Sequence, residues 1–148
     1  QKVLSKEEVE SRYEILMDEY EKQINIEALT MLDIAKKDIL PAASKFSKEL
    51  TDTIANKKAI GIDLIYEIET AKKVSEYLTE AYQAMMTLEN DVKKLHEIDD
   101  FEKSAFYVRD FIIQDMASLR KPCDELEVIT SNSDWPFPTY GKLLFGIQ

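Results

Sequence analysis

Apolar residues recur at every third or fourth position along most of the chain, which is the spacing of one face of an α-helix. Two short polar breaks divide them into three stripes. The first stripe comprises Val9, Tyr13, Leu16, Tyr20, Ile24, Ala28, Met31, Ala35, Ile39, Ala42, Ala43, Phe46, Leu50 and Ile54. The second comprises Leu64, Ile68, Ala71, Leu78, Tyr82, Met85, Leu88, Val92 and Leu95. The third comprises Phe101, Ala105, Val108, Ile112, Met116, Leu119, Cys123 and Leu126.

Residues that cap helices stand at the beginning of each stripe. Ser5 followed by Glu8 forms a capping box, in which the hydroxyl accepts a backbone N–H and the Glu reaches back. Asp63 can cap the second helix, and Asp99 or Asp100 the third. The sequence therefore predicts three long helices, at about 6–56, 63–97 and 100–129.

Pro41 interrupts the first stripe, because proline lacks the N–H donor and clashes with the preceding turn. We expect a kink or a short break there, with Pro41 opening the next helix. Short connections make neighbouring helices antiparallel, so the predicted fold is an all-α, up-down-up bundle. A straight helix over 6–55 would span roughly 75 Å, against about 50 Å for the second. Either it folds back at Pro41 and gives a fourth helix, or one end projects.

The last segment, 130–148, differs in composition from the helical stripes, with loop-forming residues followed by prolines and aromatic residues. It predicts an extended aromatic tail. Its Trp135-Pro136-Phe137-Pro138 run must be extended, since each proline disfavours helix at the residue before it. Two interpretations stay open: a clasp over one end of the core, or an anchor for another domain or subunit, to which a Trp and Phe cluster is suited. The candidate interface or tail-docking residues are Trp135, Phe137, Tyr140, Leu144 and Phe145.

Composition narrows the function classes. With 45% hydrophobic residues, 32% charged residues, three glycines and four prolines, the chain suits a helical domain with a real core. Its net charge of −10 disfavours nucleic acid and anionic membranes as partners. No apolar run approaches the ~20 residues of a membrane span. The only cysteine, Cys123, excludes an internal disulfide and suits the cytoplasm.

Candidate catalytic chemistry is sparse, so we predict no catalytic, cofactor-binding or metal-binding residue in this segment. The only histidine, His96, stands near a helix end, where a cation is favourable, rather than mid-helix as a phosphotransfer bundle requires. A di-metal carboxylate bundle needs Glu-x-x-His on each of two helices, and the residue three before His96 is Lys93. Three glycines could hardly build a phosphate loop.

Several stretches, in order, resemble the C-terminal part of type III glutamine synthetases. The tail run WPFPTYGKLLF (135–145) resembles the C-terminal signature of that family, apart from Lys142 at a spot associated with an acidic residue. RKPCDELE (120–127) looks like the helix leading into that tail. SRYEILMDEYEKQ (11–23) and INIEALTMLDIAKKDILPA (24–42) are similar to the first C-terminal helix.

This resemblance implies a parent enzyme that ligates ammonia to glutamate with ATP and Mg²⁺ or Mn²⁺, in a large double-ring oligomer. It places the catalytic residues upstream, so none is carried over onto this chain. The expected role is an accessory domain for assembly, stability or regulation, with the catalytic domain of the same chain and neighbouring subunits as partners. The alternative is a free-standing helical adaptor that binds partner helices.

Overall fold

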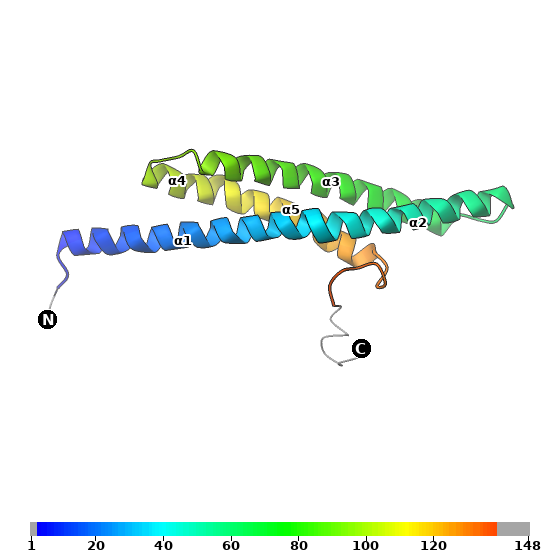
Figure 1. Ribbon diagram of the computed structural model, residues 1–148, viewed down its shortest axis with the longest axis horizontal. Coiled ribbons are helices and arrows are strands. Elements are labelled where there is room, and N and C mark those ends of the chain that lie inside the picture. The colour runs from blue at the N-terminus through cyan, green and yellow to red at the C-terminus, as the bar shows by residue number, and fades with distance from the viewer. Residues whose placement is uncertain (1–2, 139–148) are drawn as a thin grey trace.

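The computed structural model describes residues 3–138 and forms an elongated bundle without strands over that range (Figure 1). The chain runs out along one long rod, returns along a second helix and runs out again along a third. The elements are α1 (Lys6–Ile34), the π-helical turn η1 (Ala35–Ile39), α2 (Leu40–Ala59), α3 (Ile65–Leu95), α4 (Phe101–Tyr107), the π-helical turn η2 (Val108–Ile112) and α5 (Ile113–Ile129). The predicted all-α, three-helix bundle is confirmed.

The predicted caps are present at two of the three helix starts. Ser5 and Glu8 form the capping box, with Glu8 N–H donating to Ser5 Oγ at 3.2 Å and Ser5 N–H donating to Glu8 Oε2 at 2.9 Å. Asp100 caps α4 by accepting the Lys103 N–H at 2.9 Å. Asp63 does not cap α3, because Leu64 holds the N-cap position and Asp63 instead accepts the Leu64 N–H.

The kink or short break expected at Pro41 takes the form of the wide turn η1, after which α2 begins at Leu40 with Pro41 in its first turn. The rod continues through this point without folding back, so of the two expected outcomes one end projects (Figure 1). The wide turn η1 explains how. In a regular helix the proline ring would clash with the carbonyl of Lys37, four residues before it. Lys37 lies inside η1, where the Leu40 N–H donates to the Ala35 carbonyl five residues back. The wider turn accommodates the proline while the rod continues.

Five of the eight buried residues of α3 recur every seven positions, as in a coiled coil: Glu67, Val74, Ala81, Leu88 and Leu95. Met85 and Val92 are also seven residues apart, and Asp91 is the eighth buried residue. The rod follows the same spacing from Ala28 to Ala35 and from Ala43 to Leu50, but takes eight residues from Ala35 to Ala43, across η1. Eight residues of a regular helix overshoot two turns by about 80°. The π turn absorbs this extra residue and keeps both halves of the rod facing α3.

The third helix also contains a π turn that takes up one residue beyond the seven-residue spacing. The buried residues Ser104 and Ile112 are eight residues apart across η2. After Ile112 the buried residues Leu119 and Leu126 follow at intervals of seven residues. The Ile113 N–H donates to the Val108 carbonyl, five residues back. Both wide turns lie where the rod passes the third helix, since η1 contacts α5 and η2 contacts α1. The bundle core forms from α2, α3, α5 and both π turns, with only the second half of α1.

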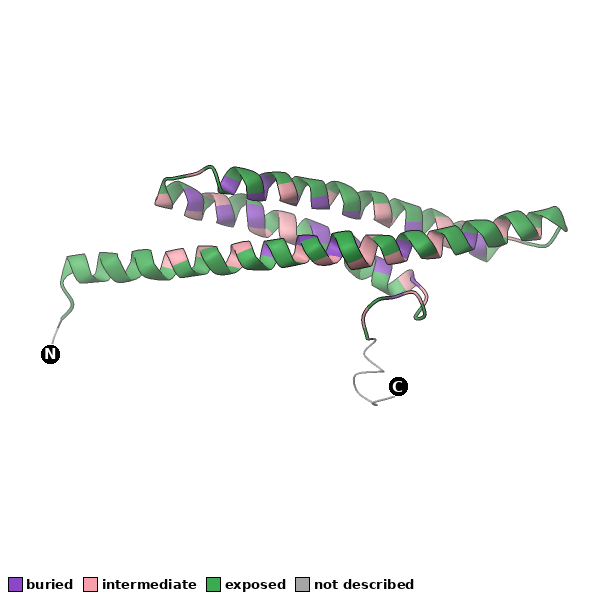
Figure 2. Ribbon diagram, in the orientation of Figure 1, coloured by how far each residue is buried: buried purple, intermediate pink, exposed green. Residues whose placement is uncertain are grey.

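Burial is uneven along the rod (Figure 2). The first half of α1 is almost wholly exposed and extends past the α3–α4 connection, and we call residues 6–24 the arm. The opposite end of the molecule is a turn of α2 into α3, where Gly61 has a φ of +74°, a conformation that favours glycine. Lys57 and Glu67 form an ion pair across this turn.

Candidate interface

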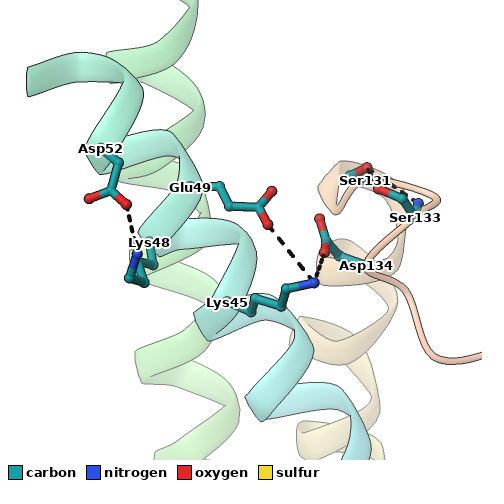
Figure 3. Close-up of polar contacts among 7 residues, drawn as sticks. All are labelled: Lys45, Lys48, Glu49, Asp52, Ser131, Ser133 and Asp134. Carbon is teal, nitrogen blue, oxygen red and sulfur yellow. Dashed lines mark hydrogen bonds and ion pairs between the residues drawn. The ribbon is translucent and has the colours of Figure 1, made fainter. Parts of the chain in front are cut away.

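The start of the tail is a folded loop on the side of the bundle. The N–H groups of Asp134 and Trp135 both donate to the Ser131 carbonyl, at 3.0 and 2.9 Å. Ser131 Oγ also accepts the Ser133 N–H and lies 2.7 Å from Ser133 Oγ (Figure 3). These bonds turn the chain directly after α5 and bring Trp135 and Phe137 against the core.

Trp135 faces inward from this loop. It is 8% exposed and belongs to the hydrophobic core, against which Phe137 also packs. The two rings meet edge to face, with centroids 6.2 Å apart and planes at 71°, a favoured aromatic arrangement. In this chain the pair covers its own bundle. Tyr140, Leu144 and Phe145, the other candidate residues, lie outside the described part of the chain.

Asp134 fastens the loop to α2. One carboxylate oxygen accepts from Lys45 Nζ at 2.7 Å, and Lys45 also lies 3.9 Å from Glu49 (Figure 3). The Asp134 side chain is 3% exposed while that of Lys45 is 64% exposed, so the lysine covers the acid from the solvent side. The hydrogen bond from Lys45 to Asp134 raises the pKa of the lysine. Neighbouring Lys48 pairs instead with Asp52, along the helix.

The arm exposes large apolar side chains that the bundle does not cover. The exposed ones are Val9, Tyr13, Ile15, Leu16 and Tyr20, of which Leu16 is 64% exposed. Val9, Tyr13, Leu16 and Tyr20 share one face by helical spacing. Adjacent exposed apolar groups of this kind mark interaction surfaces in proteins that are otherwise well packed.

Beside this face lies a groove between α1 and α4, which we call the arm groove. One hollow of about 360 Å³ and another of about 400 Å³ share Tyr13, Phe101 and Glu102. The lining is apolar at the floor and charged at the edge: Val9, Tyr13, Met17, Tyr20, Phe101, Ala105 and Phe106, with Glu10, Glu14, Glu102 and Arg109. The arm groove was not foreseen from sequence, because it depends on where α4 ends up beside α1.

A second groove, of about 400 Å³, lies between the rod and α5 at η1. Its walls are mostly aliphatic and include Ile34, Ile39 and Leu119. Cys123 also lines it, but burial raises the pKa of that thiol to about 11, so it stays protonated and unreactive near neutral pH. Cys123 therefore packs as a small, buried side chain.

One buried polar cluster links α3 to the third helix. Asp91 is 7% exposed and accepts from Lys94 Nζ at 2.7 Å. Asp115 lies close by, and its Oδ2 is buried without a hydrogen-bond partner in the described range. Burial, and then the neighbouring Asp91, raise the pKa of Asp115 to about 6. Burial opposes ionisation of Asp91, but hydrogen bonds from Lys94, Tyr107 and Asp115 hold its pKa below the ordinary value.

The remaining candidates do not assemble into a reactive site. His96 Nε2 lies 3.3 Å from Asn25 Oδ1 at the surface. Across residues 3–138 no three His, Cys, Asp or Glu side chains are grouped so as to hold a metal ion. In the same range no helix is both long and apolar enough to cross a membrane.

Comparison with known proteins agrees with the family resemblance of the sequence. The family model described as "Glutamine synthetase C-terminal domain" matches residues 1–58, which span α1, η1 and nearly all of α2. A glutamine synthetase of Butyrivibrio fibrisolvens is 33% identical over 99% of this chain and 21% of its own length. The chain belongs to the glutamine synthetase C-terminal domain family. The resemblance seen in the sequence is thereby confirmed.

Two further glutamine synthetases match over a similar share. A type-3 glutamine synthetase of Dictyostelium discoideum is 28% identical over 97% of this chain and 20% of its own length. A glutamine synthetase of Bacteroides fragilis is 24% identical over 98% of this chain and 21% of its own length. This member of the glutamine synthetase family thus spans about one fifth of the length of its curated relatives, aligned with their C-terminal part.

Proposed function

We propose that this chain is the C-terminal accessory segment of a type III glutamine synthetase. The parent enzyme joins ammonia to glutamate and cleaves ATP to ADP and phosphate, with Mg²⁺ or Mn²⁺ in its catalytic part. The coverage of one fifth of the relatives, at their C-terminal part, supports this placement. A free-standing adaptor is less well supported, because three relatives carry the whole of this segment within a longer ligase.

Within that enzyme the segment performs no chemistry and helps to hold the subunits of the ligase together. The observation that carries this proposal is the arm. A bundle that already buries a continuous core has an extension of about five helical turns whose apolar face is left in water. Exposed apolar stripes of this size are costly unless another surface covers them. An oligomeric ligase provides such surfaces on its catalytic domains and its neighbouring subunits.

The direct test is to remove residues 1–148 from the full-length ligase and to measure particle size by sedimentation velocity. We expect smaller particles than the intact enzyme forms at the same concentration. Intact rings with altered stability or turnover would instead make the segment a stabiliser or regulator.

A matched pair of single substitutions separates the arm from the rest of the bundle. Leu16→Lys places a charge on the exposed face of the arm, and Val128→Lys places one on α5, where the side chain is 79% exposed. Both changes leave the core of the segment intact. We expect Leu16→Lys to weaken the assembly and Val128→Lys to leave it unchanged. Equal effects from both would show that the arm has no special role.

A further inference from the structure

The shape of the arm groove identifies its occupant as a short helix. The residues on the α1 side run from Val9 to Tyr20, which is about 17 Å or three helical turns. The opposite wall is shorter and is formed by residues 101–109, about two helical turns, with half-buried Phe101 in both hollows and exposed Phe106 in one. A groove with three turns of α1 on one side and two turns with aromatic side chains on the other matches the apolar face of an amphipathic helix placed at i, i+3, i+4 and i+7.

The charge on the edge of the arm groove specifies the polar flanks of that helix. Three carboxylates, Glu10, Glu14 and Glu102, border it against a single cation, Arg109. Arg109 does not neutralise these carboxylates, since its guanidinium binds Asp110 at 2.6 Å and lies 4.9 Å from the centre of the Phe106 ring. Within residues 3–138, Glu14 and Glu102 make no ion pair. An occupant with lysine or arginine beside its apolar face would satisfy them.

The relatives indicate where such a helix comes from. About four fifths of their length lies outside the matched segment, which is their C-terminal part. In such a ligase the preceding polypeptide enters this segment at the arm, within a few residues of the groove. Tethering a ligand this close to its site gives a high effective concentration.

We infer that the arm groove binds a basic amphipathic helix from the preceding part of the same ligase polypeptide. This inference rests on the proposed function, and it makes the arm a rigid connection that fixes the bundle relative to the catalytic part. Neither a second copy of the bundle nor the neighbouring subunit supplies the occupant. A second copy of the bundle would be a poor occupant, because its net charge of −10 would be repelled by the carboxylates that line the groove.

Site-specific photocrosslinking in the full-length ligase tests the occupant. A benzophenone amino acid replaces Tyr20 in the groove, and Val128 on α5 serves as the exposed control position. Enzyme is assembled from a mixture of ¹⁴N- and ¹⁵N-labelled subunits, so that mass spectrometry separates crosslinks within a subunit from those between subunits. We expect Tyr20 to crosslink to a preceding segment of its own subunit, at a residue with Lys or Arg within one helical turn.

Three results would overturn the inference: crosslinks to residues 1–148 of another copy, crosslinks to a neighbouring subunit, or a yield no higher than at Val128. The charge argument is tested with Glu14→Gln combined with Glu102→Gln. We expect a several-fold loss of the Tyr20 crosslink, while Glu80→Gln with Glu127→Gln, at exposed sites elsewhere, leaves the yield unchanged. An equal loss in both double variants would also overturn the inference.

The deletion test keeps the two proposals apart. If the rings dissociate without residues 1–148 but Tyr20 finds no preceding helix, the assembly role stands and only the occupant is wrong. If the rings persist and Tyr20 crosslinks as expected, the occupant is right and the assembly role is wrong.

Discussion

Replacing Asp115 by asparagine should stabilise the bundle, and more so at pH 8 than at pH 5.5. In the folded chain the pKa of Asp115 is raised from an ordinary 3.8 to about 6 by burial and by Asp91. A raised pKa contributes stability that is complete below the unfolded value and is lost as the pH rises through the folded value. Above pH 6 the folded chain must therefore hold a second charge beside Asp91. An asparagine removes that charge and still donates a hydrogen bond to Asp91.

The magnitude follows from the size of the pKa change. A rise of about two pH units corresponds to at most about 3 kcal/mol at pH 8, where Asp115 is ionised in both states. Because Asp115 is only half-buried, solvent screening reduces this to about 1–2 kcal/mol. At pH 5.5, below this pKa, most folded molecules still carry the proton on Asp115. After the same screening, the advantage of Asp115→Asn should then be smaller by roughly 0.5 kcal/mol.

Urea unfolding of the isolated segment, followed by circular dichroism at the two pH values, measures this difference. Several other carboxylates, including Glu67 and Glu89, have lowered pKa values and so favour the folded state as the pH rises. Only the difference between variant and parent is therefore informative. Asp99→Asn, at an exposed position, is the matched control. If Asp115→Asn changes stability equally at both pH values, or destabilises more at pH 8, the shared-proton account of this cluster is wrong.

Four further expectations concern the packing. Gly61→Ala should cost about 1–2 kcal/mol in urea unfolding purely through its positive φ, since a Cβ there meets no atom within 4 Å. Leu88→Ala, at a fully buried position in α3, should cost about 2–5 kcal/mol in the same assay. Trp135→Ala should cost about 3 kcal/mol and lower the melting temperature by several degrees, and an unchanged melt would show that the loop adds no stability. Cys123 should react with a disulfide reagent only slowly until the protein unfolds, because its thiol is buried and its pKa is about 11.

The number, type and order of the helices could be predicted from sequence because the apolar spacing is continuous and the breaks are clear. The predicted ranges differ from the observed helix ends by at most three residues. At Pro41 the two expected outcomes could not be separated, since the effect of a proline depends on whether the preceding turn can widen. The sequence does contain a signal for the wide turns. The step from Ala35 to Ala43 is eight residues, whereas the steps before and after it, from Ala28 to Ala35 and from Ala43 to Leu50, are seven residues each.

The candidate surfaces were harder to predict. Trp135 and Phe137 were singled out because a Trp and Phe cluster in an extended run suits an interface anchor, but the pattern could not say whether they face the bundle or a partner. The apolar face of the arm was visible as part of the first stripe. The difference in helix length indicated that one end of the first helix could project, but it did not decide between projection and folding back at Pro41, nor which end would project. The Asp91 and Asp115 cluster gave no signal, since its members come from different helices and lie among ordinary surface carboxylates in the sequence.

The two π turns determine where the length of this domain can change. Each π turn contains one residue more than the seven-residue repeat. In a regular helix that residue would rotate the helix half on one side by about 100° relative to the half on the other side, and the π turn cancels this rotation. Deleting one residue within 35–39 would give an ordinary α-helix locally with a seven-residue step, so both halves of the rod would still face α3. Deleting one residue elsewhere in the rod, where no wide turn takes up the change, would rotate the arm relative to α2 by about 100°. The arm groove would then lose its alignment with α4. Length variation among relatives should therefore collect at the two π turns and in the connections 60–64 and 96–100.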